Sequence, residues 1–359
     1  MKITSRDSTH ADQLAQPDQR AARSDPPLLP RALPRILVPE TIPRKPYRKR
    51  PNCEKDVKHW GQRKLCLSEI EFLTDHIPHD RDSDRDRGQS EGPYQIIVIY
   101  AGAAPGTHIT MLVDLFPQVH QWVLIDPARF GLADHPKVEK RREFFTDKLA
   151  AELRDRFRGL CVLFISDIRT ANWKQMTQKA NERQIAQDNS DQMHWCQIMQ
   201  PDKAMLKFRL PYGDGHTMYL PGEIRFQVWA PPSSTETRLI TSCYDPAKLR
   251  AYSHLEYEQR LFYFNTEVRM KQHFPHSIKG PGLDFQYDSA AEVLILSRYL
   301  IRFDKDLVSR IKAQGLDKAG KEGAIRQRIT ELSKGLSELI GESDESLAGR
   351  LPESARRKL

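Results

Sequence analysis

Short apolar runs alternate with amphipathic stretches along the middle of the chain. Four runs have the length and the continuous hydrophobicity of buried strands, and they span residues 95–100, 122–126, 160–166 and 204–208. Between them, residues 107–116 and 145–157 place apolar side chains at helical spacing. Strands that alternate with helices predict an α/β fold, in which helices cover both faces of a mostly parallel sheet.

The pattern continues on the carboxyl side of these strands. Late strands are expected at 223–229 and 236–242, and helices at 255–270 and 288–303. From 305 to 359 the chain contains no aromatic residue, but apolar positions between Ile325 and Leu339 recur at helical spacing. We therefore expect a folded domain over 58–304, followed by a charged helical extension over 305–359.

The amino-terminal side differs from the rest. Residues 60–77 carry a helical pattern, whereas 80–92 contain no apolar residue and predict an exposed insertion. The first 51 residues hold 11 Lys and Arg, 5 Asp and Glu, and 9 of the 24 prolines. A basic, proline-rich stretch buries too little apolar surface to offset the entropy of ordering, so residues 1–57 are expected to be a disordered arm.

The charge of the chain is concentrated in this arm. The formal net charge is +8, and the counts above assign +6 of it to the first 51 residues. The basic end of the arm, residues 44–50, suits attraction to nucleic acid or a nuclear import signal, and a solvated tail is the alternative. The expected location is therefore nuclear, or cytoplasmic if the protein is viral.

The composition disfavours several classes of protein. The chain has 359 residues, of which 39% are hydrophobic, and its apolar runs are far shorter than the ~20 residues of a membrane span. The polar amino terminus does not predict a secretory signal. The five scattered cysteines include no CxxC pair, which favours a reduced intracellular compartment over a disulfide framework or a zinc ribbon.

The turn after the first predicted strand is the most informative segment. Gly102 and Gly106 allow a sharp turn and a close approach of the backbone to a ligand. The segment lacks the motifs of a phosphate-binding loop and of a dinucleotide site, and Pro105 removes an amide donor. Asp126 ends the second strand, where a carboxylate suits a ribose diol. The pattern favours an adenosyl cofactor such as S-adenosylmethionine, with an ordinary tight connection as the alternative.

Four charged residues stand where such a fold buries its chain. They are Lys64 in the first helical pattern, Asp167 after a buried strand, Lys207 within another, and Glu236 at the start of a late strand. Burying a lone charge is expensive, so these residues are expected to pair. Both a catalytic constellation and a structural ion-pair cluster fit this pattern.

Seven segments occur here in the order found in a known family. They are Gly-Gln-Arg-Lys-Leu (61–65), Tyr-Ala-Gly-Ala-Ala-Pro-Gly-Thr-His (100–108), Leu-Ile-Asp (124–126), Ile-Ser-Asp-Ile-Arg (165–169), Leu-Lys-Phe-Arg-Leu-Pro-Tyr (206–212), Glu-Thr-Arg-Leu (236–239) and Tyr-Glu-Gln-Arg-Leu-Phe-Tyr-Phe-Asn (257–265). Over residues 58–303 the chain resembles poxvirus-type cap-specific mRNA nucleoside-2′-O-methyltransferases, a family with relatives in large DNA viruses and trypanosomatids. The resemblance implies a Rossmann-like methyltransferase that uses S-adenosylmethionine.

The resemblance implies a catalytic tetrad at the four charged positions, Lys64, Asp167, Lys207 and Glu236. The methyl group of a sulfonium is a good electrophile, so the enzyme mainly orients a ribose 2′-hydroxyl and accepts its proton. A lysine becomes a better base where burial and a second cation lower its pKa. We assign Lys207 as the base, Lys64 as the neighbouring cation, and the two carboxylates as orienting groups.

The resemblance also implies binding residues. Cofactor contacts map to Gln62, Tyr100, Gly102, Gly106, Asp126, Arg129, Phe145 and Asp167, with one extra residue before Arg129 relative to the family. In the family, aromatic rings sandwich the methylated guanine of the cap and carboxylates read its edge. The matching positions are Tyr212, Asp214 and Glu258. The second ring, which lies upstream in the family, has no clear match, and we assign Tyr47 to it. An ordinary turn is the alternative for the Pro-Tyr-Gly-Asp segment at 211–214.

Two features with histidine are assigned no chemistry. His108 follows the glycine turn, and a histidine at a helix start is expected to be a hydrogen-bonded structural residue. His194 and Cys196 have no second cluster of ligands that would complete a metal site, so no metal is expected.

The sequence thus predicts a cap-specific 2′-O-methyltransferase that acts on a ribose at or near the first transcribed nucleotides of 5′-capped mRNA. The alternative is a non-catalytic or bifunctional RNA-binding subunit that resembles the processivity factor of poly(A) polymerase. A nicotinamide oxidoreductase is disfavoured because the GxGxxG motif is missing.

Overall fold

A seven-stranded sheet forms the centre of the computed structural model, which describes residues 26–48, 61–78, 95–170, 176–231, 233–280 and 283–339. The strand order is β3-β2-β1-β4-β5-β8-β7. The strands are β1 (Ile96–Ala101), β2 (Val119–Ile125), β3 (Val138–Arg141), β4 (Cys161–Ser166), β5 (Lys203–Phe208), β7 (Glu223–Arg225) and β8 (Thr237–Thr241). The first five in this order run parallel, and β8 is antiparallel to both of its neighbours. The mostly parallel α/β sheet expected from the sequence is confirmed.

The two central strands end side by side. Every residue of β1 and β4 is buried, because helices cover both faces of the sheet and leave no place for alternating polar side chains. Ala101 pairs with Ser166, so the loops that follow β1 and β4 start at the same level. The chain runs from β1 through β2 to β3 on one side of β1, and then crosses back to β4 on the other side. This is the switch point at which open α/β sheets form their ligand crevice.

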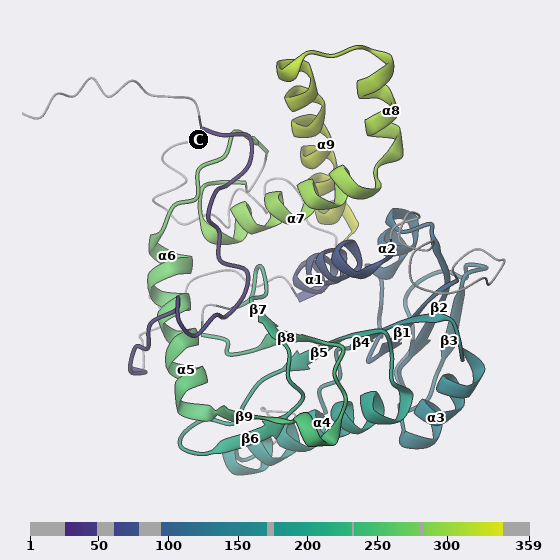
Figure 1. Cartoon of the computed structure of the whole chain (residues 1–359), viewed down its shortest axis with the longest axis vertical. Helices are drawn as coiled ribbons and strands as arrows, with labels where there is room; N and C mark the ends of the chain where they lie inside the picture. Colours follow the sequence, from purple (N-terminus) through teal and green to yellow (C-terminus); the bar gives the residue numbers. More distant parts are fainter. Residues whose placement is uncertain are drawn as a thin grey trace, which may run out of the picture.

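Helices cover both faces of the sheet (Figure 1). Helices α1 (Gly61–His76), α2 (Ile109–Leu115) and α7 (Tyr287–Phe303) lie on one face, and α3 (Asp147–Arg156) and α4 (Gln178–Met199) on the other. Helix α1 contacts both α2 and α7, and α3 contacts α4. The hydroxyls of Thr146 and Thr177 cap the first turns of α3 and α4.

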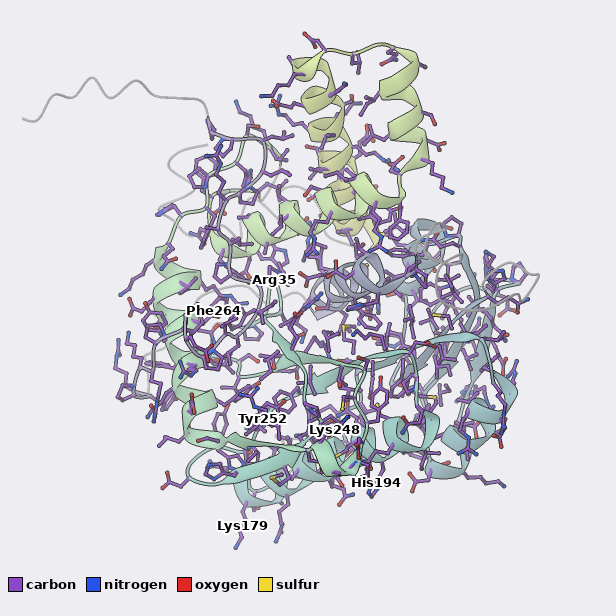
Figure 2. All side chains as sticks on the ribbon, in the orientation of Figure 1. Arg35, Lys179, His194, Lys248, Tyr252 and Phe264 are labelled. Atoms are coloured by element: carbon purple, nitrogen blue, oxygen red, sulfur yellow. The ribbon has the colours of Figure 1, made fainter. Side chains whose placement is uncertain are left out.

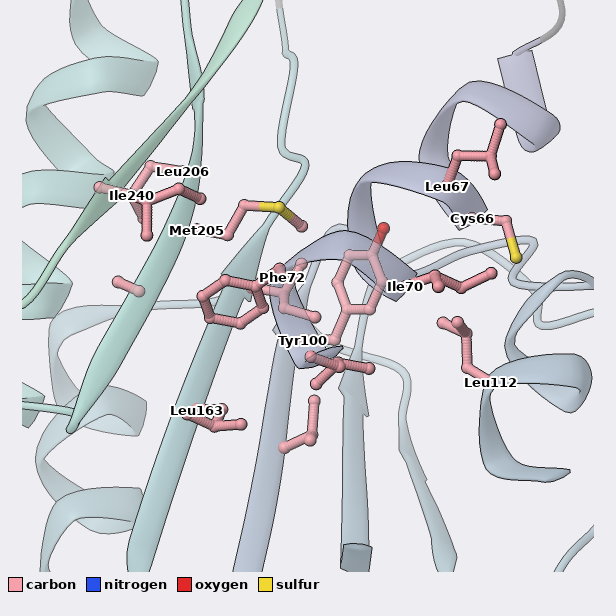
Figure 3. Close-up of a cluster of buried hydrophobic side chains, with 14 of the residues drawn as sticks. Cys66, Leu67, Ile70, Phe72, Tyr100, Leu112, Leu163, Met205, Leu206 and Ile240 are labelled. Carbon is pink, nitrogen blue, oxygen red and sulfur yellow. The ribbon is translucent and has the colours of Figure 1, made fainter. Parts of the chain in front are cut away.

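The hydrophobic core lies between α1 and the sheet. Figure 3 shows Phe72 of α1 above the strands and the hydroxyl of Tyr100 pointing towards α1. The buried side chains of α1 include Cys66, Leu67, Ile70 and Phe72. Because Gln62 and Lys64 lie in the first turn of this helix, its packing fixes the position of two predicted site residues.

A smaller unit is built beside the sheet. Strands β6 (His216–Tyr219) and β9 (Arg250–Ser253) form an antiparallel pair. Helix α5 (His254–Tyr263) then continues through a π-helical turn (Phe264–Val268) into α6 (Arg269–Lys271). The ring of Phe264 stacks on that of Phe226 with centroids 3.6 Å apart, which joins this helical column to the end of β7.

The expectation of a disordered arm over 1–57 is wrong for residues 26–48. Arg35 (labelled in Figure 2) is buried. Its guanidinium donates to the carboxylate of Glu71 at 2.9 and 2.6 Å and to the hydroxyl of Tyr287 at 2.7 Å. The hydrogen bonds among Arg35, Glu71 and Tyr287 satisfy these buried polar groups. They order the segment although its basic, proline-rich composition predicts disorder. Residues 1–25 and 49–57 lie outside the described residues.

The same segment pairs with the free side of strand β7. Ile36 forms a bridge with Arg225, and the N–H of Leu37 donates to the carbonyl of Ile224 at 2.8 Å. Leu37 and Ile42 are buried in the core. Residues 35–42 are therefore an integral part of the fold.

The carboxyl-terminal extension is helical as far as it is described. Helices α8 (Lys305–Ala313) and α9 (Lys318–Leu339) form a hairpin, and α9 packs back on α7 (Figure 1). Ile329, Leu332 and Leu336 are buried, in agreement with their helical spacing. Residues 340–359 and the expected insertion at 80–92 lie outside the described residues.

Some elements escaped the pattern. Strand β3 consists of the half-buried residues Val-Glu-Lys-Arg, which carry no apolar run, and the four-residue strands β6 and β9 are too short for a clear alternation. The strand expected at 223–229 ends at Arg225, and Trp229 adopts a left-handed φ of 57°. Among the described residues, no helix is both long and apolar enough to cross a membrane.

Candidate active site

The loop after β1 packs tightly against the loop after β4. Gly102 and Gly106 have left-handed φ angles of 79° and 66°. A Cβ on Gly102 would lie 2.9 Å from the backbone nitrogen of Ile168, and one on Gly106 would lie 2.7 Å from the carbonyl oxygen of Ala103. Both the conformation and the space at these positions therefore require glycine.

Asp126 ties this loop to strand β2. Its carboxylate accepts the backbone N–H of Ala104 at 3.1 Å and that of Ala128 at 2.8 Å. Each carboxylate oxygen can accept a further hydrogen bond, and the side chain is only half-buried. Asp126 thus retains acceptor capacity at the carboxyl edge of the sheet, as a partner of a ribose diol requires.

A buried hydrogen-bond network connects β1 and α2 to helix α1. The Tyr100 hydroxyl donates to Glu69 Oε1 at 2.6 Å, and His108 Nε2 lies 3.1 Å from the same oxygen. His108 Nδ1 lies 2.7 Å from Gln62 Oε1. Burial and the nearby Glu69 carboxylate raise the pKa of Tyr100, which keeps its hydroxyl protonated. His108 has the structural role expected for it, and Glu69 is a member that the sequence pattern did not reveal.

The four charged residues meet beside the loop after β1 that contains Gly102 and Gly106, here called the glycine loop. Lys64 Nζ lies 2.9 Å from Glu236 Oε1. Lys207 Nζ lies 3.3 Å from Asp167 Oδ1 and 3.7 Å from Glu236 Oε2. Between 11% and 19% of each side chain remains exposed, so a substrate group can reach the cluster. The pairing expected from the sequence is therefore present.

The charges in this cluster stabilise one another. Burial disfavours the charged form of Asp167, but Lys207 and Arg238 outweigh it and hold the pKa of this carboxyl below its usual range. Burial is likewise outweighed at Glu236, mainly by Lys64 and Lys207, and its pKa lies well below the usual range. Burial lowers the pKa of Lys64, since Glu236 compensates for it only in part. Both acids are thus carboxylates at neutral pH.

Arg238 is a further charged member that the sequence pattern did not reveal. It lies opposite Lys207 in the antiparallel pairing of β5 with β8. Its Nη2 forms an ion pair with Asp167 Oδ1 at 2.6 Å, and 3% of its side chain is exposed. Gln227 adds a hydrogen bond from its Nε2 to Glu236 Oε1 at 3.1 Å. An arginine inside the predicted strand 236–242 was the available signal.

Two residues assigned to the cofactor lie apart from this network. The side chain of Arg129 is exposed in the loop after β2. Phe145 is 8% exposed, and its ring packs against Phe164 and Trp195 at centroid distances of 5.5 and 4.6 Å. The Phe145 ring is therefore part of the core, and the assignment of this residue to the cofactor stays a prediction.

Phe144 is the exposed aromatic ring of the same loop, at 68%. It follows strand β3, whose last residue, Arg141, accepts the N–H of Asp126 through its carbonyl at 3.1 Å. The sequence offered two adjacent phenylalanines, and only burial distinguishes them.

Tyr212 and Asp214 lie in a loop between β5 and β6. Tyr212 is 41% exposed, and the guanidinium of Arg209 stacks 4.4 Å from its ring centroid. The hydroxyl of Thr235 donates to that of Tyr212 at 3.2 Å. Asp214 is exposed between Gly213 and Gly215, whose φ angles are 88° and 130°. The turn chemistry and the exposed aromatic ring are both present.

Tyr47 packs against helix α5, and Glu258 is a residue of that helix. Tyr47 is 57% exposed, and its ring meets that of Phe262 edge-on at 5.3 Å. Glu258 precedes Phe262 by one helical turn, so both face the same side of α5. The hydroxyl of Tyr257 donates to the carbonyl of Thr235 at 2.7 Å, which connects α5 to the Tyr212 loop. The four expected cap residues are thus distributed around α5 and this loop.

Metal ligands do not gather in the part of the chain that the structure describes. No group of three or more His, Cys, Asp or Glu side chains there could hold an ion. His194 lies on α4, on the far side of the sheet from α1 (Figure 2).

The comparisons with known proteins agree on one family. The family described as poly A polymerase regulatory subunit matches residues 36–310. The cap-specific mRNA (nucleoside-2′-O-)-methyltransferase of fowlpox virus (strain NVSL) is 30% identical over 225 residues, 59% of this chain and 68% of that protein. The proteins of the same name from the Lausanne and Uriarra strains of myxoma virus are 30% identical over 231 residues, 60% of this chain. The alignment spans 63% of their length, which is less than two thirds.

A more distant likeness is found among solved structures. Bluetongue virus VP4, described as a multifunctional RNA-capping production line, aligns with a TM-score of 0.36 and 15% identity, over 67% of this chain and 38% of that one. This likeness is too distant to support an argument about the site.

Proposed function

This chain belongs to the poly(A) polymerase regulatory subunit family, and on that premise we propose that it methylates a ribose 2′-hydroxyl at or near the first transcribed nucleotides of 5′-capped mRNA. The observation that carries the proposal is the contact among Lys64, Asp167, Lys207 and Glu236 beside the glycine loop. A Cβ on Gly102 would lie 3.0 Å from the carbonyl carbon of Asp167, so the loop and the charged cluster are adjacent at the carboxyl edge of the sheet.

S-adenosylmethionine suits the residues at this edge of the sheet. The glycine loop offers backbone that a side chain would obstruct, and Asp126 offers acceptors for a ribose diol. Gln62, Gly102, Gly106 and Asp126 would hold the cofactor, which supplies an electrophilic methyl group when bound. The methyltransferase relatives support this assignment.

Lys207 is the residue that we assign to the substrate hydroxyl. Asp167 and Glu236 approach its Nζ at 3.3 and 3.7 Å and so fix it in position. Lys64 and Arg238 keep these two carboxylates ionised and in place. After Nζ has released its own proton to solvent, the neutral amine orients the ribose 2′-hydroxyl and accepts its proton, which in turn leaves to solvent through the exposed part of the side chain.

The cap guanine is assigned to the surface around α5. A 7-methylguanine is cationic and stacks favourably on an aromatic face. Because Arg209 covers one face of Tyr212, the guanine would take the other face, with Tyr47 as the second ring. Asp214 and Glu258 are acceptor groups that suit the N–H donors on the guanine edge.

A lysine substitution tests the catalytic assignment. Lys207→Ala should lower methyl transfer from labelled S-adenosylmethionine to capped RNA by about a hundredfold or more, because both orientation and proton acceptance are lost. Cofactor binding, measured by calorimetry, should change by less than about twofold. The matched control is Lys203→Ala on the same strand, whose Nζ bonds only the Ser242 hydroxyl among the contacts described, at 3.2 Å. Full activity of Lys207→Ala would exclude the assignment.

The RNA substrate is tested with the unchanged protein. Transfer should depend on the cap and should disappear when the first transcribed nucleotide already carries a 2′-O-methyl group, if that nucleotide is the target. Continued transfer to the methylated RNA would place the target further along the chain.

The family description supports a second role, in which this protein binds a poly(A) polymerase. Processive tailing by a polymerase only when this protein is added would support that role. Lys207→Ala should preserve it, because the substitution affects the methyl-transfer site alone.

Nuclear localisation remains a proposal based on the basic residues 44–50. Arg44 donates to Gln259 at 2.9 Å and Lys45 pairs with Glu267, so an import receptor would compete with these contacts on α5 and the π-helical turn. Imaging of a fluorescent fusion, with and without Lys45→Ala, distinguishes nuclear from cytoplasmic location.

A further inference from the structure

A buried ion pair lies next to Lys64 on helix α1. Arg63 stands between Gln62 and Lys64, and 1% of its side chain is exposed. Its Nε and Nη2 donate to the two carboxylate oxygens of Glu292 on α7, at 2.9 and 2.5 Å. Neither Arg63 nor Glu292 has a role in the mechanism described above.

Helix α9 completes the hydrogen bonds of this pair. Arg63 Nη1 donates to the Ser337 hydroxyl at 2.7 Å, and Nη2 donates to the hydroxyl and the carbonyl of Ser333 at 3.0 and 3.2 Å. Both serines are buried. Helix α9 spans 318–339, whereas the family match ends at residue 310. An element outside the family match therefore contacts the helix that carries Gln62 and Lys64.

Glu292 also holds the opposite side of the charged cluster. Its Oε2 accepts the indole N–H of Trp229 at 2.7 Å, and Trp229 keeps a left-handed φ of 57°. Two residues earlier, Gln227 donates to Glu236 Oε1 at 3.1 Å, the same oxygen that Lys64 Nζ approaches at 2.9 Å. Lys64 and Gln227 thus both contact this oxygen. Each lies within two residues of a partner of Glu292, which is Arg63 for Lys64 and Trp229 for Gln227.

We propose that helix α9 positions the catalytic site: Ser333 and Ser337 hold Arg63 on Glu292, and this contact sets the first turn of α1, and so Lys64, against Glu236. This inference rests on the proposed methyl-transfer function. Arg63, Glu292 and the two serines are positioning residues, because they act through Lys64 and Gln227.

The physical reason is the burial of the guanidinium. A buried charged group is stable only while its donors are paired, and each missing acceptor leaves a donor unsatisfied. When the serine hydroxyls are lost, the first turn of α1 gains other arrangements in which Arg63 reaches water. Lys64 would then leave its position near Glu236, and a displacement of about 1 Å in a positioned site lowers the rate by up to about a hundredfold.

The test uses the full chain with Ser333→Ala and Ser337→Ala combined. We expect kcat for capped RNA to fall about tenfold while KM changes by less than about twofold, because the cap surface on α5 is unaffected. Amide hydrogen exchange of residues 61–66 should accelerate, with no change in strand β1. The matched control is Ser297→Ala, a buried serine of α7 whose hydroxyl donates to the carbonyl of Leu294 at 2.8 Å.

The outcomes distinguish the positioning role of α9 from the proposed methyl transfer. A fall in kcat that Ser297→Ala reproduces would mean that lost stability alone explains it, and the positioning role would be wrong. Unchanged kcat would equally overturn the proposal, whether or not exchange accelerates. If the unsubstituted protein fails to methylate capped RNA, the proposed function is wrong, and hydrogen exchange alone then decides whether α9 holds α1.

Discussion

The side of the molecule proposed to bind the cofactor and the side proposed to bind the cap are built in opposite ways. Around the tetrad, polar groups are buried and held by ion pairs such as Arg238 with Asp167, at 2.6 Å. Around the cap surface, Tyr212 and Tyr47 are 41% and 57% exposed and lie on loops. Methyl transfer requires fixed geometry, whereas stacking tolerates small shifts. Substitutions on the first side should therefore affect stability as well as activity, and those on the second mainly affinity.

The strongest challenge to this contrast is Arg238→Met. Removal of the buried cation leaves Asp167 with incomplete compensation, so the free energy of unfolding should fall by about 3–5 kcal/mol, and activity should be lost. Urea denaturation measures the change. The control is Arg156→Met, which breaks an exposed pair with Glu139 of 2.7 Å and should lower the free energy of unfolding by no more than about 1 kcal/mol. Equally small decreases in the free energy of unfolding for Arg238→Met and Arg156→Met would show that burial of the ion pair does not determine its contribution.

A pair of glycines sharpens the same contrast. Gly102→Ala should lower the free energy of unfolding by about 1–3 kcal/mol through its φ of 79° and should also weaken cofactor binding, because the new Cβ would meet backbone at 2.9 Å. In the loop that carries Tyr212, Gly213 has a φ of 88°, but a Cβ there would meet no atom within 4 Å. Gly213→Ala should therefore carry only the conformational cost. Thermal unfolding and cofactor titration measure both effects. Weaker cofactor binding in Gly213→Ala would contradict the assignment of the two sides.

Acid should destabilise the cofactor side first. The folded-state pKa values of Asp167 and Glu236 lie below the usual range, so their ionised forms stabilise the fold above about pH 4. That contribution is lost as the pH falls through the lowered pKa values, at up to about 1.4 kcal/mol per pH unit for each proton taken up. Urea midpoints between neutral pH and acid should show a shallower loss for Glu236→Gln than for the unsubstituted protein. An unchanged slope would show that Glu236 is not held as described.

The smallest effect on stability is expected at the cap surface. Tyr212→Ala should change the free energy of unfolding by less than about 0.5 kcal/mol, since the side chain is exposed. The KM for capped RNA should nevertheless rise about tenfold through loss of stacking, while Tyr212→Phe should retain affinity. Steady-state kinetics with capped and uncapped RNA give the comparison. A similar loss for both RNAs would mean that Tyr212 does not read the cap.

The sequence predicted those parts of the site that depend on local order. Apolar runs identified β1, β4 and β5, and the position of a charge at a strand end or within a strand identified Asp167 and Lys207. Asp167 follows β4 directly, and Lys207 is the second-last residue of β5. Because β4 and β5 are parallel neighbours, their carboxyl ends lie together. That placement required no knowledge of distant contacts.

The missed features depend on partners far apart in the sequence. Arg35 lies in a proline-rich stretch, and its partners Glu71 and Tyr287 are 36 and 252 residues away. Arg238 resembles any strand residue until Asp167 is placed beside it. Phe144 and Phe145 have the same chemistry and differ only in burial. Long-range pairing and exposure, rather than composition, separated these residues.

The pairing of residues 35–37 with β7 has a consequence for solubility. Strand β7 is the last strand of the sheet. The N–H of Leu37 donates to the carbonyl of Ile224 in β7, and the N–H of Phe226, the residue after β7, donates to the carbonyl of Arg35. Without this segment, the backbone of β7 would present unpaired donors and acceptors to strands of other molecules. Removal of residues 1–50 should therefore promote self-association, whereas removal of 1–25 should not. We therefore expect residues 35–37 to keep the edge of the sheet from pairing with a neighbouring copy.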